Sequence, residues 1–228
     1  MRQLLLDWGA ARPQTLDNFV VGRNQELAAR LRQIATHAST ASDAVLLLIW
    51  GEAGSGKSHL IKALTSNISA QRLTPTSPLD AFNWSANHTL YLIDDCDQLN
   101  SAQQQALFNL INQVREHHGA LIATAKQAPL QLSLREDLRT RLGWGLVYQV
   151  HGLSDEEKID ALTQSAISRG LSLSAGVLPY LLTHFRRDMQ SLSTMLDALD
   201  RYSLETQRPI TLPLLRELLQ TGDRASSP

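Results

Sequence analysis

One glycine-rich stretch constrains the fold of this chain more than any other feature. It reads G-x-x-x-x-G-K-S over residues 51–58, follows the apolar run Val45–Ile49 and leads into a helical pattern, Leu60–Leu64. Its glycines let the backbone curl so that successive N–H groups point inward at a phosphate. A helix that begins near Lys57 adds its positive end to the same site. The stretch predicts a strand, a phosphate-binding loop and a helix, which together bind a nucleotide.

The side chains of this loop predict the ligands. Lys57 can reach the β- and γ-phosphates, and the Ser58 hydroxyl can coordinate Mg²⁺. We therefore expect a nucleotide with Mg²⁺ at this site. The alternative is a glycine-rich turn with an incidental lysine, which the strand pattern before it and the helix pattern after it disfavour. The expected nucleotide contacts are Gly51, Glu52, Ala53, Gly54, Ser55, Gly56, Lys57, Ser58 and His59.

Paired carboxylates form a second strong feature. The apolar run Leu90–Ile93 ends in Asp94 and Asp95. At the carboxyl end of a strand beside the loop, Asp94 can hold Mg²⁺ through water while Asp95 orients the attacking water. Both are candidate catalytic residues, and Asp94 joins Ser58 as a candidate metal ligand. The alternative is a polar strand end that caps the next helix.

Hydrophobic periodicity divides the chain in two. Before Gly152, helices are expected at 25–37 and 101–118, the latter closed by Gly119, and strands at 120–124 and 146–150. No confident strand is expected in residues 71–87. After Gly152 only helices are expected, at 154–170, 175–184, 188–202 and 212–219, the first with a Ser154–Glu157 capping box. This order predicts an α/β domain with a parallel sheet core, residues 14–152, followed by a small all-α domain and short tail, residues 153–228.

Composition limits the environment and the partners. The 21 basic and 22 acidic residues give a formal net charge of −1, so we expect no strong direct binding of nucleic acid. We find no signal peptide and no apolar run of membrane-spanning length, which predicts a cytoplasmic protein without a membrane partner. The single cysteine, Cys96, excludes an intramolecular disulfide and is expected to be a small packing residue.

The first 13 residues do not look like part of a core. Gln3, Leu4, Leu6 and Trp8 combine a polar hook with apolar plugs, which is the format of a linear docking motif. The alternative is a strand that pads the domain's own core.

Two arginines, Arg139 and Arg141, precede a tryptophan flanked by glycines, Trp144. They can be surface charge, members of an ion pair, or a cation offered to a neighbour's phosphate. Thr124, at the end of an expected strand, is a weaker candidate for contact with the γ-phosphate or the catalytic water.

Together these motifs resemble the AAA+ ATPases, which are P-loop NTPases, and within them the DnaA-type replication initiators, over residues 14–220. Residues 15–22 resemble the initiator's adenine-side signature, which implies that Val20 and Val21 flank the base. The resemblance thus implies ADP or ATP with Mg²⁺ as the cofactor. Residues 51–58 match Walker A and residues 93–95 match Walker B. The resemblance also implies that the all-α domain is the AAA+ lid.

The same resemblance assigns roles to two arginines. Residues 139–145 are similar to the family's arginine-finger segment, with Arg141 at the finger position. Arg187 occupies the sensor 2 position in the lid, which implies that it closes over the phosphates. Lys126, near sensor 1, departs from the acidic residue that initiators tend to have there. Residues 71–87 also depart, so we expect the second of the usual five strands to be reduced.

The expected function follows from what accompanies this AAA+ module. No DNA-binding helix-turn-helix domain follows the lid before Pro228, and residues 3–8 are similar to the peptide that binds the sliding clamp of DNA polymerase III. The resemblance thus implies a negative regulator of replication initiation. It would dock on the clamp, contact ATP-bound DnaA and stimulate hydrolysis of that ATP through Arg141, with weak or no ATPase activity of its own. The AAA+ interface also allows self-association. The alternatives are a DNA-remodelling or helicase-loader-type ATPase, and a non-catalytic clamp adaptor.

Overall fold

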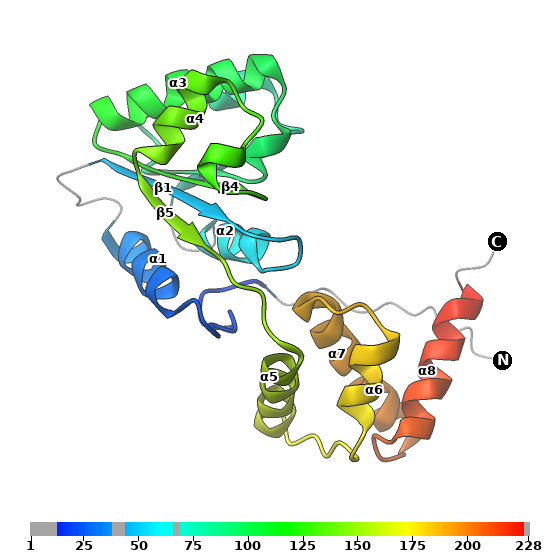
Figure 1. Ribbon diagram of the computed structural model, residues 1–228. Helices are drawn as coiled ribbons and strands as arrows, with labels where there is room; N and C mark the ends of the chain where they lie inside the picture. The colour runs from blue at the N-terminus through cyan, green and yellow to red at the C-terminus, as the bar shows by residue number, and fades with distance from the viewer. Residues whose placement is uncertain (1–12, 38–43, 66–68, 226–228) are drawn as a thin grey trace. The chain divides into compact units, whose positions relative to one another are not determined.

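The computed structural model describes residues 13–37, 44–65 and 69–225, which fall into two compact units divided after Gly152 (Figure 1). Each unit has a hydrophobic core of its own. Within the described ranges, no helix is both long and apolar enough to cross a membrane.

The first unit is built on a five-stranded parallel sheet, which confirms the predicted α/β class. The strands are β1 (Val45–Trp50), β2 (Ala70–Leu73), β3 (Leu90–Ile93), β4 (Ala120–Ala125) and β5 (Leu146–Gln149). Their spatial order is β2-β3-β4-β1-β5, so β1 lies between two strands that come much later in the chain. The central strand β4 is buried at all six positions.

Strand β2 lies in a region where no confident strand was expected, and it is reduced to four residues, as the family resemblance implied. It is short, yet it pairs with β3 along its whole length, from Ala70 opposite Leu90 to Leu73 opposite Ile93. Its sequence, Ala-Gln-Arg-Leu, lacks the apolar run typical of a central strand because β2 lies at the edge of the sheet and buries fully only Leu73. The strand signal is therefore weak although the pairing is complete.

Helices cover both faces of this sheet (Figure 1). One hydrophobic cluster joins α1 (Gln25–His37) and α2 (Lys57–Thr65) to the sheet, and the other joins α3 (Ser101–Glu116) and α4 (Glu136–Gly143). Three short 3₁₀ segments, η1 (Leu79–Phe82), η2 (Cys96–Gln98) and η3 (Pro129–Gln131), lie in the connections. Helix α4, which carries Arg141, is an addition to the elements expected from the sequence.

The end of α3 differs from its expected closure. His118, with a φ of 53°, takes the left-handed position, and the N–H of Gly119 bonds the Val114 carbonyl at 2.8 Å. Gly119 thus occupies the second position after the helix, where a positive φ is not needed. The sequence placed the helix end at this turn, with Gly119 closing it, and the structure ends α3 two residues before the expected His118.

The second unit has four helices within residues 153–225, namely α5 (Asp155–Ser168), α6 (Val177–His184), α7 (Met189–Thr206) and α8 (Leu212–Ala225). The predicted capping box is present: Ser154 accepts from the Glu157 N–H at 3.2 Å, and the Glu157 carboxylate accepts from the Ser154 N–H at 2.7 Å. Gly170, with a φ of 71°, ends α5 as expected. Leucines from all four helices, together with Met195 of α7, form the core.

Candidate nucleotide site

The loop between β1 and α2 has the backbone that a phosphate cradle needs. Gly54 and Gly56 have φ angles of 77° and 104°, which residues with a side chain rarely adopt. At Gly51 the constraint is space, because a Cβ atom there would lie 2.5 Å from the Val150 carbonyl oxygen. Glu52 and Ala53 are exposed at the loop's tip, whereas the Ser55 hydroxyl is buried and has no hydrogen-bond partner among the described residues. The loop therefore offers backbone N–H groups and one orphaned hydroxyl to a ligand.

Lys57 begins α2 and is folded back into the loop. Its ammonium donates to the carbonyls of Gly51 at 2.6 Å and Glu52 at 2.8 Å. Burial lowers the pKa of Lys57 below its ordinary value, and the nearby negative charges, Asp95 foremost, oppose that shift. The side chain is thus a cation held within the loop, where it can neutralise phosphate charge.

The Asp94 carboxylate accepts hydrogen bonds from three side chains of the site. Asp94 is 5% exposed and stands directly after β3. Its Oδ1 accepts from the Ser58 hydroxyl at 3.2 Å and the Thr124 hydroxyl at 3.0 Å, and its Oδ2 accepts from the Arg72 guanidinium at 2.9 Å. The structure therefore brings together Ser58 and Asp94, the two expected metal ligands, and adds two residues to them.

A magnesium ion fits this donor set. Ser58 and Asp94 present hard oxygen ligands side by side, and the rest of the described chain adds no cluster of three or more His, Cys, Asp or Glu side chains that could hold a metal. Mg²⁺ binds through one or two protein oxygens while phosphate and water complete its octahedron. Ser58 and Asp94 would hold it, and the ion would supply charge neutralisation at the phosphates.

Asp95 adopts a backbone conformation that is uncommon for a residue with a side chain. Its φ is 53°, and its N–H donates to the Thr124 hydroxyl at 2.9 Å. Burial, followed by repulsion from Asp94 and Asp97, raises the pKa of its carboxyl group. Asp95 precedes the 3₁₀ segment η2, but its side chain forms no capping hydrogen bond. The helix-capping alternative therefore does not apply to Asp95.

Thr124 has a different place from the one predicted. It is fully buried, and its hydroxyl links the Asp94 carboxylate to the Asp95 N–H. It shapes the paired aspartates instead of facing a ligand directly. Lys126, two residues further on, is exposed. Arg72 is the site residue that the sequence analysis missed, because its strand was itself not recognised.

The expected adenine-side segment borders the loop. The Phe19 ring packs close to Gly56, because a Cβ atom added to Gly56 would lie 2.9 Å from that ring. The centroids of the Phe19 and His59 rings are 5.5 Å apart. The His59 Nε2 lies 3.0 Å from the Thr15 carbonyl oxygen. Val20 and Val21 are half-buried on the same segment. The segment is thus fixed to α2, and the role of the two valines stays a prediction.

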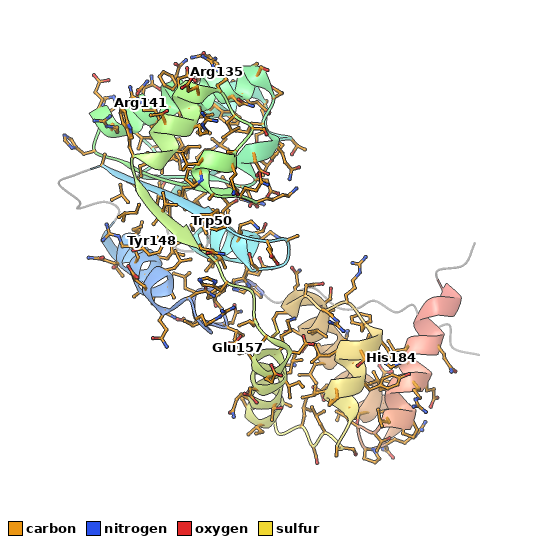
Figure 2. The ribbon with its side chains drawn as sticks, viewed as in Figure 1. Trp50, Arg135, Arg141, Tyr148, Glu157 and His184 are labelled. Atoms are coloured by element: carbon orange, nitrogen blue, oxygen red, sulfur yellow. The ribbon has the colours of Figure 1, made fainter. Side chains whose placement is uncertain are left out.

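Arg141 lies on α4, apart from the loop residues in sequence and on the face covered by α3 and α4 (Figure 2). Its guanidinium carbon is 4.7 Å from the centroid of the Trp144 ring and 5.4 Å from that of Phe108. Trp144 is 64% exposed. In the described part of the chain no carboxylate pairs with Arg141, which lies in the last turn of α4, whereas Arg135 at the start of that helix pairs with Asp137 at 2.8 Å. Of the three predicted possibilities, the ion pair is excluded within these residues.

Two sets of predicted residues lie elsewhere. Arg187 belongs to the helical unit, where its Nε donates to the Leu182 carbonyl at 3.2 Å and its guanidinium lies 3.8 Å from Asp155. Its predicted contact with phosphate stays a prediction. The docking peptide, with Gln3, Leu4, Leu6 and Trp8, is outside the described residues, so clamp binding also stays a prediction.

Two protein-family models match this chain, one in each unit. The model of the bacterial DnaA ATPase domain matches residues 11–76 and 80–149, more than half of the chain, and the model of the Hda lid domain matches residues 155–219. The chain belongs to the DnaA-related AAA+ ATPases. Within this family it is most like Hda, because its helical unit matches the Hda lid.

One relative and two solved structures are also similar to this chain. An uncharacterized protein of Haemophilus influenzae is 33% identical over 218 residues, which cover 90% of this chain and 93% of that protein. Domain III of the Thermotoga maritima replication initiation protein DnaA superposes with a TM-score of 0.71 at 19% identity, over 92% of this chain and 96% of that one. The replication initiator DnaA bound to AMPPCP and single-stranded DNA gives 0.63 at 19% identity, over 86% and 70%. Both structures share the AAA+ fold that the sequence predicted for this DnaA-related chain.

Proposed function

We propose that this protein is a negative regulator of replication initiation that stimulates hydrolysis of the ATP bound to DnaA. Membership of the DnaA-related family and the match to the Hda lid support the regulator class. The stimulation of hydrolysis is inferred from the surroundings of the Arg141 guanidinium. This guanidinium rests on Trp144 and Phe108, and no carboxylate among the described residues neutralises it. A cation presented in this way suits the γ-phosphate of a nucleotide held by a second protein.

The protein's own loop is proposed to bind ADP or ATP with Mg²⁺. The glycine cradle, the buried Lys57 and the Ser58–Asp94 pair support this assignment, as does the AMPPCP-bound initiator with the same fold. We propose that the nucleotide serves this protein mainly as a structural ligand, with slow turnover of its own. Asp94 and Asp95 would act in that slow turnover, and Arg141 would act in the partner's site.

Substitution of Arg141 tests the proposal. Arginine fingers supplied in trans contribute about 10³ to 10⁵ in rate. Arg141→Ala should therefore abolish the stimulation of phosphate release from ATP-loaded DnaA in the presence of clamp and DNA, while ADP binding is retained. Arg139→Ala, two residues earlier on the same helix, is the matched control and should keep its stimulation. Full stimulation by Arg141→Ala would refute the finger assignment.

The same assay separates the alternatives. A DNA-remodelling or loader-type ATPase would hydrolyse its own ATP with DNA alone and would not need the initiator. A non-catalytic adaptor would bind the clamp and leave hydrolysis by DnaA unchanged. Phosphate release measured with and without each component distinguishes these results.

Clamp docking is proposed to reside in the N-terminal peptide. Gln3→Ala combined with Leu6→Ala should remove clamp binding, measured by surface plasmon resonance, because both the polar hook and an apolar plug are lost. Arg2→Ala is the control from the same peptide and should bind as the unaltered protein does. An unchanged affinity of the double variant would favour the core-padding alternative.

A further inference from the structure

Arg72 places a fixed positive charge on the carboxylate of the metal site. Strand β2 pairs with β3 up to Leu73, and the Asp94 N–H continues the ladder by bonding the Leu73 carbonyl at 2.8 Å. This backbone pairing sets Asp94 next to the end of β2. The Arg72 Nη2 then donates to the Asp94 Oδ2 at 2.9 Å. The ion pair thus rests on main-chain pairing between two strands.

The hydrogen-bonding capacity of Asp94 is largely taken by the protein itself. Two hydroxyls, from Ser58 and Thr124, share Oδ1, and the guanidinium takes Oδ2. The Asp94 side chain is 7% exposed and that of Arg72 is 35% exposed. An ion pair with one buried partner is screened by water less than a surface pair, so the positive charge of Arg72 acts strongly at this position.

This arrangement changes what a divalent cation can gain at Asp94. A carboxylate attracts Mg²⁺ through its negative charge, and here one guanidinium already compensates that charge. A metal ion brought to the same carboxylate also meets the like charge of Arg72 a few ångströms away, which repels it. Nucleotide phosphates, in contrast, meet a site in which Asp94 has been neutralised without any metal.

We propose that Arg72 replaces part of the function of Mg²⁺ at this site, so that the protein binds nucleoside diphosphate with little dependence on the metal. Arg72 forms an ion pair with the Asp94 carboxylate, and Lys57 provides a second cation in the phosphate loop. The inference rests on the proposed nucleotide binding and adds a residue that controls its metal requirement.

Titration with a fluorescent ADP derivative, in millimolar Mg²⁺ and in EDTA, tests this inference. The readout is the ratio of the two Kd values for each variant, so a general change in stability or affinity cancels. For the unaltered protein the ratio should stay below about threefold. Arg72→Gln should raise it about tenfold, since an uncompensated carboxylate repels phosphate when no metal is present and attracts Mg²⁺ when it is.

Two further variants define the cause. Arg72→Lys keeps the positive charge and should retain a low ratio. Arg139→Gln removes the same charge from helix α4 of the same unit and should leave the ratio unaltered.

A ratio for Arg72→Gln equal to that of the unaltered protein would overturn the inference and leave the proposed function intact. The inference would also fall if Arg72→Lys depended on Mg²⁺ as Arg72→Gln does, or if Arg139→Gln shifted the ratio equally. If the unaltered protein bound no ADP in either buffer, this inference and the proposed nucleotide binding would both be wrong.

Discussion

The guanidinium carbon of Arg141 lies 4.7 Å from the centroid of the Trp144 ring, three residues further along the chain. The same guanidinium carbon is 5.4 Å from the centroid of the Phe108 ring in α3. The guanidinium carbon of Arg115 is 6.0 Å from the centroid of the Trp144 ring. Trp144 is 64% exposed, and the face of its ring attracts the Arg141 cation. The pair restricts the orientations of Arg141 before any partner arrives.

Loss of the Trp144 ring should weaken the proposed finger without removing it. A cation–π contact at an exposed site contributes about 0.5–1 kcal/mol, so Trp144→Ala should lower the stimulation of phosphate release from ATP-loaded DnaA roughly two- to fivefold. Trp144→Phe keeps an aromatic face and should retain most of the activity. Leu204→Ala removes another exposed apolar side chain, 72% exposed, and serves as the control. Equal stimulation by Trp144→Ala and the unaltered protein would argue against this positioning.

The Thr124 hydroxyl should matter more to stability than its methyl group. Thr124→Val keeps the volume but leaves the Asp95 N–H unsatisfied and removes a donor to Asp94, at a cost of about 1–3 kcal/mol. Thr124→Ser keeps both bonds and loses one buried methyl, about 1 kcal/mol. We expect the valine variant to have the lower free energy of unfolding in urea titrations. A larger loss for the serine variant would show that packing, not the hydrogen bonds, dominates at this position.

The sequence predicted those parts of the structure that have a strong periodic or spacing signal. The buried runs of β1, β3 and β4 and the glycines of the loop predicted the sheet and the cradle, and Ser154 with Glu157 predicted the start of α5. These signals are local, so a single sequence contains them.

The parts that were missed depend on contacts between distant segments. Arg72 looks like an ordinary polar residue until β2 pairs with β3, and only then does its side chain meet Asp94, 22 residues away. Thr124 lies 30 residues from the carboxylate that it bonds, and nothing in its own neighbourhood predicts this contact. Helix α4 is likewise a short polar segment that is fixed mainly by burial of Leu138 and Leu142.

Gly56 should tolerate no side chain. Its φ is 104°, and an added Cβ would approach the Phe19 ring to 2.9 Å. Gly56→Ala should therefore cost about 1–3 kcal/mol of backbone strain in addition to the clash, and it should weaken nucleotide binding by distorting the cradle. Gly152→Ala is the matched control, because a Cβ there meets no atom within 4 Å and φ is not positive, so its stability should change by less than about 0.5 kcal/mol. Thermal unfolding and ADP titration measure both effects, and equal stability of the two variants would contradict the assigned strain.

His59 should make the α/β unit less stable in mild acid. Burial lowers the pKa of His59 in the folded protein, although the Thr15 carbonyl partly opposes the shift. Because the folded pKa lies below the unfolded value of about 6.5, the unfolded chain binds the proton first as pH falls. The stabilisation is present above about pH 6.5 and is lost as pH falls through the folded pKa, with a slope of at most about 1.4 kcal/mol per pH unit.

Urea unfolding between about pH 7.5 and 5 measures this dependence. His59→Gln should flatten the slope over that range. His151→Gln is the matched control for the loss of a half-buried histidine from the same unit. A slope that stayed the same in His59→Gln would assign the acid sensitivity to other groups.

The strand order has a consequence for the time course of synthesis. In the sheet that the structure describes, strand β1, Val-Leu-Leu-Leu-Ile-Trp, pairs with β4 and β5. About 75 residues separate the starts of β1 and β4, and at roughly 5–20 residues per second the ribosome needs several seconds to supply them. During that interval an apolar strand has emerged with both of its edges unpaired, which is the condition in which chains associate wrongly. The nascent chain should therefore depend on chaperones most strongly between the translation of β1 and that of β5.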